Sequence, residues 1–214
     1  MILAVAHTKG GVGKSTLANN IAIALLLLNK KVKIIDLDFQ KTLYLTNQLR
    51  QMNEKGSLDV VHVQSREEIA ELINSHNEDD YLVIDVGGFD SDINRIALLG
   101  SDFIITPLSD SVTEVFGLKT FETILAEIGV ENVHVLLNNI SPSTKNLDHI
   151  IDGINEYKGM KVMNTIIRQR ADFKRTMGMG MGVVELEQDS KAKDEINELV
   201  KEILSSFALE TEKE

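Results

Sequence analysis

The sequence predicts an α/β protein built on a doubly wound, mostly parallel sheet with helices on both faces. Short apolar runs alternate with segments of helical periodicity along the whole chain, and this alternation is typical of consecutive βαβ units. A glycine-rich segment also joins the first apolar run to the first helical segment, which is where such folds bind phosphate groups. With 214 residues, the chain is long enough to build one domain of this kind around a substantial core.

Seven apolar runs have the length of buried strands. We expect these strands at residues 2–6, 31–38, 58–63, 81–85, 103–107, 133–137 and 162–167. The segments between and after them have helical spacing, and we expect helices at residues 17–28, 41–52, 66–73, 93–99, 113–128, 147–157, 171–177 and 191–207. Ser65 and Glu68 form a capping box at the start of one of these helices, and Gly129 ends another.

We predict a single domain, residues 1–207, because no internal repeat or proline-rich linker divides the chain. The last residues, 208–214, are acidic, and we expect them to form a disordered tail. Residues 177–182 alternate methionine with glycine. Because glycine leaves the backbone free to adopt many conformations, we expect a flexible connection there.

The composition excludes several classes of protein. The chain contains no cysteine, which rules out disulfides and sites where thiolates hold zinc or an iron–sulfur cluster. No segment resembles a signal peptide, and the apolar run at residues 21–28 is far too short to span a membrane, so we expect a cytoplasmic protein. The formal net charge of −11 argues against a surface covered by nucleic acid but leaves room for a local basic patch.

The histidines do not form a recognisable metal site. His7 and His134 lie on predicted strands, and neither has a second ligand at metal-binding spacing. We therefore expect both to have structural roles.

The segment Thr8–Thr16 has the features of a phosphate-binding loop. Its three glycines allow the backbone to fold closely around an oxyanion, and the amides at the start of the following helix point at that anion. In such a loop Lys14 reaches the β- and γ-phosphates, and the hydroxyl of Ser15 binds Mg²⁺. We therefore predict that a nucleotide binds to Gly10, Gly11, Val12, Gly13, Lys14, Ser15 and Thr16.

Polar side chains end three of the other predicted strands. Asp36 and Asp38 end the second strand, Asp85 ends the fourth, and Asn138 and Asn139 follow the sixth. Ligands of doubly wound sheets bind beyond the carboxyl ends of the strands, so the carboxylates and the loop together indicate an ATPase or GTPase. Asp85 is suited to hold Mg²⁺ and Asp38 to orient the attacking water. Asp36 could equally complete the magnesium shell or cap the following helix.

These motifs resemble those of a known family of ATPases. The stretch Lys9–Thr16, together with Asp36–Asp38 and Leu82–Asp85, is similar to the deviant Walker A ATPases. Within them the chain looks most like the short ParA-type partition ATPases, which lack an N-terminal DNA-binding domain. The similarity covers nearly the whole chain and includes the later blocks at residues 85–90 and 166–185.

The resemblance implies a P-loop NTPase fold with ATP and Mg²⁺ as cofactors. It makes Lys9 the signature lysine, which crosses the interface of an ATP-sandwiched homodimer to reach the partner's phosphates. The other roles that it implies are phosphate binding by Lys14, Mg²⁺ binding by Ser15, water activation by Asp38, the Walker B position for Asp85 and a place near the base for Asn138.

Two positions depart from the family's pattern. Phe39 stands where relatives often have proline, and Val86-Gly87 stands where many have Thr-Pro. Neither change removes a catalytic group, but both alter segments that respond to the nucleotide.

A short basic span suggests a second function. It contains a single acidic residue, Asp172, and six basic residues, Lys158, Lys161, Arg168, Arg170, Lys174 and Arg175. The resemblance implies DNA binding without sequence preference, and dimerisation would double such a patch. The DNA-binding candidates are Arg168, Arg170, Lys174 and Arg175, and the alternative for them is a solvated helix face.

The predicted function is that of an ATP-driven switch that segregates or positions DNA or another large cargo. We expect a homodimer with ATP, nucleoid association in that state, an adaptor resembling ParB that stimulates hydrolysis, and no contact with a membrane. One alternative is a membrane-cycling regulator resembling MinD, but anionic lipid would repel the acidic end of this chain. Another is a metabolic ATP-dependent ligase such as dethiobiotin synthetase, for which we identify no residues that would seat a small substrate.

Overall fold

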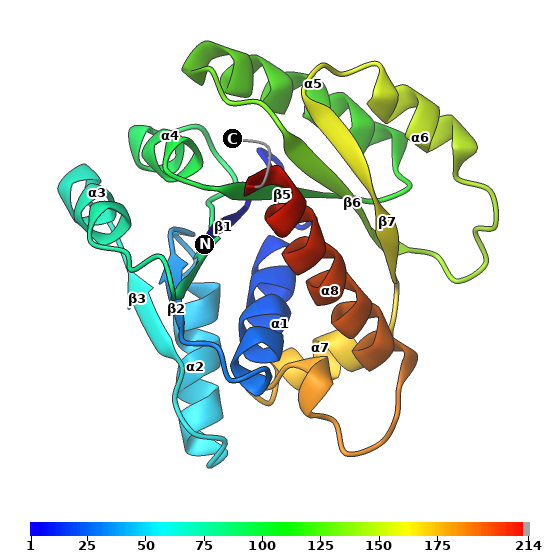
Figure 1. Cartoon of the computed structure of the whole chain (residues 1–214). Helices are drawn as coiled ribbons and strands as arrows, with labels where there is room; N and C mark the ends of the chain where they lie inside the picture. The colour runs from blue at the N-terminus through cyan, green and yellow to red at the C-terminus, as the bar shows by residue number, and fades with distance from the viewer. Residues whose placement is uncertain (212–214) are drawn as a thin grey trace.

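A parallel sheet forms the centre of the molecule in the computed structural model, which describes residues 1–211 except for the side chains of residues 112, 113, 115 and 116 (Figure 1). Its strand order is β3-β2-β4-β1-β5-β6-β7, and every neighbouring pair is parallel. The strands are β1 (Ile2–Val5), β2 (Val32–Asp36), β3 (Asp59–His62), β4 (Tyr81–Asp85), β5 (Phe103–Leu108), β6 (Val133–Ile140) and β7 (Met160–Arg168). The predicted fold class is confirmed.

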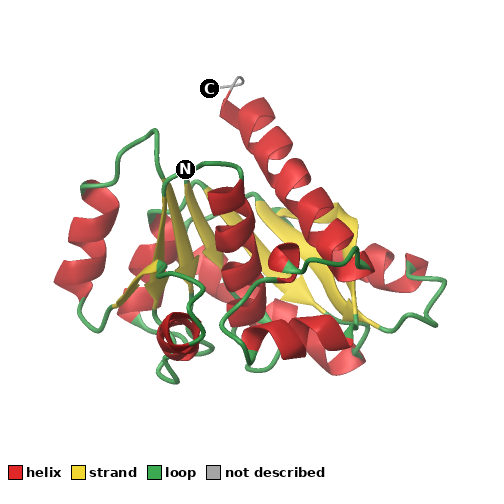
Figure 2. Ribbon diagram, turned by 90° about the horizontal axis from the view of Figure 1, so that it is seen from below, coloured by secondary structure: helices red, strands yellow, loops and turns green. Residues whose placement is uncertain are grey.

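Helices cover both faces of this sheet (Figure 2). They are α1 (Lys14–Leu27), α2 (Thr42–Met52), α3 (Arg66–Asn74), α4 (Asp92–Leu99), α5 (Val112–Ile128), α6 (Asp148–Asn155), α7 (Ala171–Met177), the 3₁₀ turn η1 (Val183–Glu185) and α8 (Lys191–Thr211). Helices α1, α2, α7 and α8 pack on one face, and α3, α4, α5 and α6 pack on the other.

Strand β1 lies in the middle of the sheet, between β4 and β5. Leu3 and Val5 belong to the core on one face, whereas Ile2 and Ala4 belong to the core on the other. Burial on both faces explains why the strand is apolar at every position. The chain passes from β1 to one side of the sheet for β2 and β4 and later to the other side for β5, so the carboxyl end of β1 is a switch point where ligands bind in such folds.

The end of the chain differs from the prediction. Helix α8 continues to Thr211, so the expectation of disorder is wrong for residues 208–211, while residues 212–214 lie outside the described part. Phe207 packs against the core, and Oε1 of Glu210 lies 3.4 Å from Nε2 of His134 and 3.7 Å from Nζ of Lys161. These contacts extend the helix by a full turn beyond the predicted end. Within residues 1–211, no helix combines the length and hydrophobicity needed to cross a membrane.

The methionine–glycine segment before η1 is packed, and the prediction of a flexible connection is wrong. The carbonyl of Met181 accepts a hydrogen bond from Nδ2 of Asn19 at 3.2 Å, and Met181 itself is buried. Gly180 lies against the backbone of Arg50 in α2. Both terminal guanidinium nitrogens of Arg50 donate to the carboxylate of Glu185 at 2.7 Å, in a pair whose side chains are only 10% and 16% exposed. This pair fastens the segment to α2.

Gly180 and Gly178 provide a matched test of that packing. Gly180 has a φ of +71°, and a Cβ there would overlap the backbone of Arg50. A Cβ on Gly178, whose φ is −64°, would approach the nearest carbonyl oxygens only to 3.5 Å. We expect Gly180→Ala to lower the free energy of unfolding in urea by about 1–3 kcal/mol or more, and Gly178→Ala to change it by no more than about 0.5 kcal/mol. Equal values for the two variants would mean that the segment is not docked on α2.

Candidate functional site

The glycine-rich loop between β1 and α1 leaves the first turn of the helix without a side-chain cap. Gly11 and Gly13 have φ values of +82° and +95°, and Gly13 is the residue that caps α1, with no side chain bonded to the first turn. The first amides of a helix have no partner within it. They are therefore available to an anion in the loop, as a phosphate-binding loop requires.

Asn138 holds this loop from a neighbouring part of the sheet. It lies within β6, which runs further than predicted, to Ile140. Its Nδ2 donates to the carbonyl of Val12 at 2.8 Å, and a Cβ on Gly13 would come within 2.6 Å of that nitrogen. Glycine is thus required at position 13 both by its φ and by Asn138. The sequence suggested a place near the base for Asn138, whereas the structure commits its amide nitrogen to the loop.

Lys14 is almost completely buried at the start of α1. Its Nζ donates to the carbonyl of Lys9 at 3.1 Å. Burial lowers the pKa of the ammonium, and the charges of Asp85 and Asp38 oppose this effect. The structure therefore brings together the lysine and two of the carboxylates that the sequence placed at this site.

Asp85 is a buried carboxylate at the centre of the site. It is opposite Val5 in the register of β4 and β1, is fully buried, and neither of its oxygens has a hydrogen bond of regular geometry among the described residues. Burial raises its pKa to about 7, while the Ser15 hydroxyl and the Lys14 ammonium act in the opposite direction. An unpartnered carboxylate beside a hydroxyl suits a divalent cation with oxygen ligands.

Ser15 and Asp85 are therefore the residues that would hold Mg²⁺. In residues 1–211, no group of three or more acidic or histidine side chains is arranged to hold a metal ion. Magnesium is commonly bound by one or two protein ligands together with phosphate oxygens and water.

Asp36 has another role than the predicted one in the magnesium shell. Its Oδ1 accepts the backbone N–H of Asp38 at 3.0 Å, and its Oδ2 accepts those of Leu43 and Tyr44, both at 3.0 Å. Burial raises its pKa, and these backbone hydrogen bonds oppose the rise. Oδ1 is engaged in the turn before α2 and Oδ2 at the start of that helix, so of the two interpretations left open by the sequence the structure supports the helix cap.

Asp38 lies in the turn between β2 and α2. Its Oδ1 accepts the N–H of Gln40 at 2.8 Å and its carbonyl accepts that of Lys41 at 2.9 Å. The side chain is partly exposed, next to Phe39, which is 76% exposed. Its charge acts on the ammonium of Lys14, so the turn brings this carboxylate near the phosphate loop, and its role toward water stays a prediction.

Gly88 is a site residue that the sequence interpretation did not include. A Cβ at this position would lie 3.5 Å from both Nζ of Lys14 and the backbone nitrogen of Gly10. The β4–α4 loop therefore lies against the phosphate loop. The pair Gly87-Gly88 directly after Asp85 was the available signal, because adjacent glycines mark close backbone approach.

The basic residues do not form one patch. Lys158 and Lys161 lie at the amino end of β7, whereas the other four basic residues lie at or beyond its carboxyl end. Because a nine-residue strand is about 30 Å long, the six residues do not share one surface.

Three of the four DNA-binding candidates have partners within the chain. Arg168 donates to the carbonyls of Ser141 and Thr144 at 3.0 and 2.8 Å. The Nε of Arg170 donates to Glu195 at 3.0 Å, and this carboxylate raises the pKa of the guanidinium. Lys174 and Arg175 are exposed on α7, although Arg175 also pairs with Asp172 at 2.7 Å.

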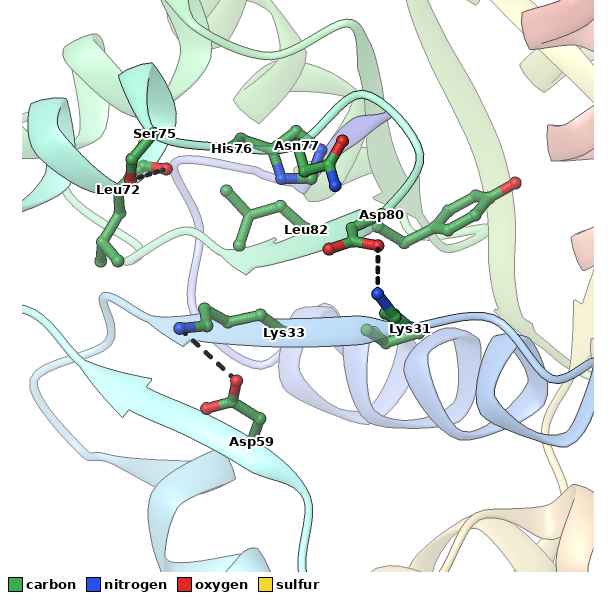
Figure 3. A pocket seen from close by; sticks show the side chains of 11 residues that line it. Lys31, Lys33, Asp59, Leu72, Ser75, His76, Asn77, Asp80 and Leu82 are labelled. Atoms are coloured by element: carbon green, nitrogen blue, oxygen red, sulfur yellow. Dashed lines mark hydrogen bonds and ion pairs between the residues drawn. The ribbon is translucent and has the colours of Figure 1, made fainter.

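A pocket at the opposite, amino-terminal edge of β2, β3 and β4 has a volume of about 300 Å³ (Figure 3). Each of its two lysines is paired with a carboxylate: Lys31 lies 3.8 Å from Asp80, and Lys33 lies 3.5 Å from Asp59. The pocket therefore offers no excess positive charge to a phosphate, unlike the loop at the other edge.

Comparison with known proteins assigns the family. Residues 3–183 match the family model described as "CobQ/CobB/MinD/ParA nucleotide binding domain". The chain belongs to this family. The match spans the phosphate loop, Asp85 and the segment before α8, and it agrees with the resemblance seen in the sequence.

Individual relatives are similar over nearly their whole length. The "Maintenance of carboxysome distribution protein A" of Halothiobacillus neapolitanus is 26% identical over 210 residues, which are 95% of this chain and 96% of that protein. The fold is similar to that of MinD in a MinC:MinD cell division complex from Aquifex aeolicus, with a TM-score of 0.78, 20% identity and coverage of 95% and 96%. It is also similar to a plasmid partition protein of Borrelia burgdorferi bound to AMPPNP, with a TM-score of 0.68, 20% identity and coverage of 96% and 98%.

The raised pKa of Asp85 has a consequence for stability. The folded state binds a proton at this carboxylate more tightly than the unfolded chain does, so the contribution of Asp85 to stability decreases as the pH rises from about 4 to about 7. In nucleotide-free protein at pH 8 we expect Asp85→Asn to melt several degrees above the wild type, with a difference that narrows toward pH 5.

Thermal melts monitored by circular dichroism at several pH values would measure this difference. Asp189→Asn, which removes one exposed carboxylate, controls for the change in net charge. A difference for Asp85→Asn that does not vary with pH would contradict the assignment of a raised pKa.

Proposed function

We propose that this chain is an ATPase that acts as an ATP-dependent switch to position a large intracellular cargo. The observation that carries the proposal is the assembly of Lys14, Ser15 and the buried Asp85 around the glycine-rich loop, at the switch point of the sheet. One cation and one triphosphate would satisfy the free helix amides, the ammonium and the unpartnered carboxylate together.

The proposed chemistry assigns each step to residues of this loop and its neighbours. Lys14 neutralises charge on the β- and γ-phosphates. Ser15 and Asp85 would hold Mg²⁺, and the ion would supply further neutralisation of charge on the phosphates. Asp38, partly exposed in its turn, orients the attacking water. Such hydrolysis needs positioning and charge compensation more than covalent catalysis.

Lys9 gives the site its proposed dependence on a second copy of the chain. It lies at the beginning of the loop, and its carbonyl is already bonded to Lys14. In the proposed dimer its ammonium reaches the nucleotide of the partner, as an arginine finger does in other phosphoryl-transfer enzymes. ATP then stabilises the dimer, and hydrolysis releases it.

The similarity to a carboxysome distribution protein supports cargo positioning as the use of this cycle. We propose that the ATP dimer binds nucleoid DNA without sequence preference and that an adaptor protein on the cargo stimulates hydrolysis. Lys174 and Arg175 are the better candidates for phosphate contacts, because both are exposed on α7 and Arg175 remains 61% exposed in its pair with Asp172. Arg168 and Arg170 are partly buried against their partners.

A membrane-cycling function receives less support. Helix α8 packs against the sheet and α1, and Glu210 in its last turn is held near His134. Both contacts would have to break before the end of this helix could lie on lipid. ATP-dependent sedimentation with anionic liposomes, in the absence of DNA binding, would favour this second function.

A DNA-binding titration with ATP, with ADP and without nucleotide tests the proposed partner. We expect binding only with ATP, without sequence preference, and weakened steeply by salt because each phosphate contact releases counterions. The double variant Lys174→Ala/Arg175→Ala should reduce the affinity and the salt slope, whereas Lys201→Ala, a change on the exposed side of α8, should not. The absence of DNA binding in every nucleotide state would exclude this partner.

Substitution of Lys9 tests the cross-dimer role. We expect Lys9→Ala to reduce the ATPase rate stimulated by DNA and adaptor by about 100-fold or more, since fingers of this kind contribute that much or more to phosphoryl transfer. The control is Lys55→Ala, which removes an exposed lysine from the loop after α2. A stimulated rate that is unchanged in Lys9→Ala would show that the lysine does not act in hydrolysis.

A further inference from the structure

His7 is a buried histidine at the junction of β1 and the phosphate loop, and its surroundings are unusually specific. It is 1% exposed. Its Nδ1 accepts the backbone N–H of Lys9 at 2.9 Å, and the carbonyl of that same Lys9 accepts Nζ of Lys14 at 3.1 Å. One residue of the loop is therefore held from both ends, by the imidazole and by the phosphate-binding lysine.

The opposite side of the imidazole is enclosed by α5. The ring of His7 stacks on Phe121, with centroids 6.1 Å apart and planes at 19°. A Cβ on Gly117 would approach Cε1 of His7 to 3.0 Å, and the carbonyl of Gly117 accepts the hydroxyl of Thr8 at 3.4 Å. Helix α5 therefore lies close against the ring.

We infer that His7 is a positioning residue for the nucleotide site: as a neutral imidazole protonated on Nε2, it fixes the Lys9 peptide and thereby orients both lysines of the loop. This inference rests on the proposed nucleotide function and adds a residue that contacts neither phosphate nor metal. A hydrogen bond from Lys9 N–H requires a lone pair on Nδ1, so the proton of the neutral ring must be on Nε2.

The electrostatics favour this form of the ring. Burial, together with the positive charges of Lys14 and Lys9, lowers the pKa of His7 to about 4, and Glu114 acts in the opposite direction. Nε2 has no hydrogen-bond partner among the described residues. A proton on Nδ1 would place two donors face to face and would release the loop from the ring.

Two substitutions separate the acceptor from the packing of the ring. His7→Phe keeps a planar ring against Phe121 but has no acceptor, whereas His7→Asn keeps an acceptor near the position of Nδ1 but has no ring. Loss of a buried hydrogen-bond acceptor costs about 1–3 kcal/mol. We therefore expect His7→Phe to weaken ATP binding, measured by calorimetry, by about tenfold or more, and His7→Asn to retain an affinity within about threefold of the wild type.

A local measurement tests the hydrogen bond independently of nucleotide binding. In ¹⁵N-labelled full-length protein at pH 7, two-bond ¹H–¹⁵N NMR correlations should show that the imidazole of His7 carries its proton on Nε2 and that Nδ1 is unprotonated. Hydrogen exchange of the Lys9 amide should be slow in the wild type and in His7→Asn, and at least about tenfold faster in His7→Phe, because the amide loses its acceptor.

Gly117→Ala tests the enclosure of the ring from the other side. Alanine is normally favoured over glycine within a helix by about 1 kcal/mol, but here its Cβ would press on His7. We expect weaker ATP binding and faster Lys9 amide exchange in Gly117→Ala. The matched control, Gly153→Ala in α6, has open space at the new Cβ and should change neither.

The outcomes distinguish this inference from the proposed function. If the wild type and His7→Phe bind ATP equally well, or if His7 carries its proton on Nδ1, the inference is wrong and the proposed function stands. If the wild type does not bind ATP, the proposed function and the positioning role both fail, even where the exchange data confirm the hydrogen bond.

Discussion

The burial of the Asp85 carboxylate without full compensation of its charge is the constraint on which the rest of the structure depends. The register of β4 and β1 places it beside the start of the phosphate loop. It is removed from water there, and among the described residues its favourable neighbours are Ser15 and Lys14. Burial of a charge without full pairing is costly. A fold selected for stability alone would place an apolar residue there, so the cost marks the position as functional.

The loop that faces Asp85 is held by side chains from several elements. Asn138 in β6 bonds the carbonyl of Val12, His7 bonds the amide of Lys9, and Gly88 allows the β4–α4 loop to approach closely. Each contact fixes a backbone group before any ligand arrives. Such preorganisation is what electrostatic stabilisation of a phosphoryl group requires.

Much of this arrangement could be predicted from local sequence. The central strands are apolar at every position because both their faces are buried. The glycines of the loop predict the positive φ values found at Gly11 and Gly13. Asp36 was ambiguous, because a carboxylate at a strand end has the same pattern whether it binds a cation or caps a helix. The choice is resolved only by the position of α2, whose first amides donate to Oδ2 of Asp36.

The errors arose where a partner lies far away in sequence. Local propensity describes alternating glycine and methionine as flexible, but Gly180 is packed against Arg50, which is 130 residues earlier. Arg168 and Arg170 looked like free cations because their partners, among them Glu195, follow or precede them by 24 residues or more. The packing of His7 against Phe121 and Gly117 of α5 is likewise a long-range contact that the local sequence does not indicate.

We propose that the loop and Asp85 form one site for ATP and Mg²⁺. The most direct test is the affinity for a non-hydrolysable ATP analogue, measured by calorimetry with Mg²⁺ and with EDTA, for the wild type and for Asp85→Asn. We expect Mg²⁺ to raise the affinity of the wild type by about tenfold or more and to have little effect on the variant. Equal affinities with Mg²⁺ and with EDTA in the wild type would contradict the account.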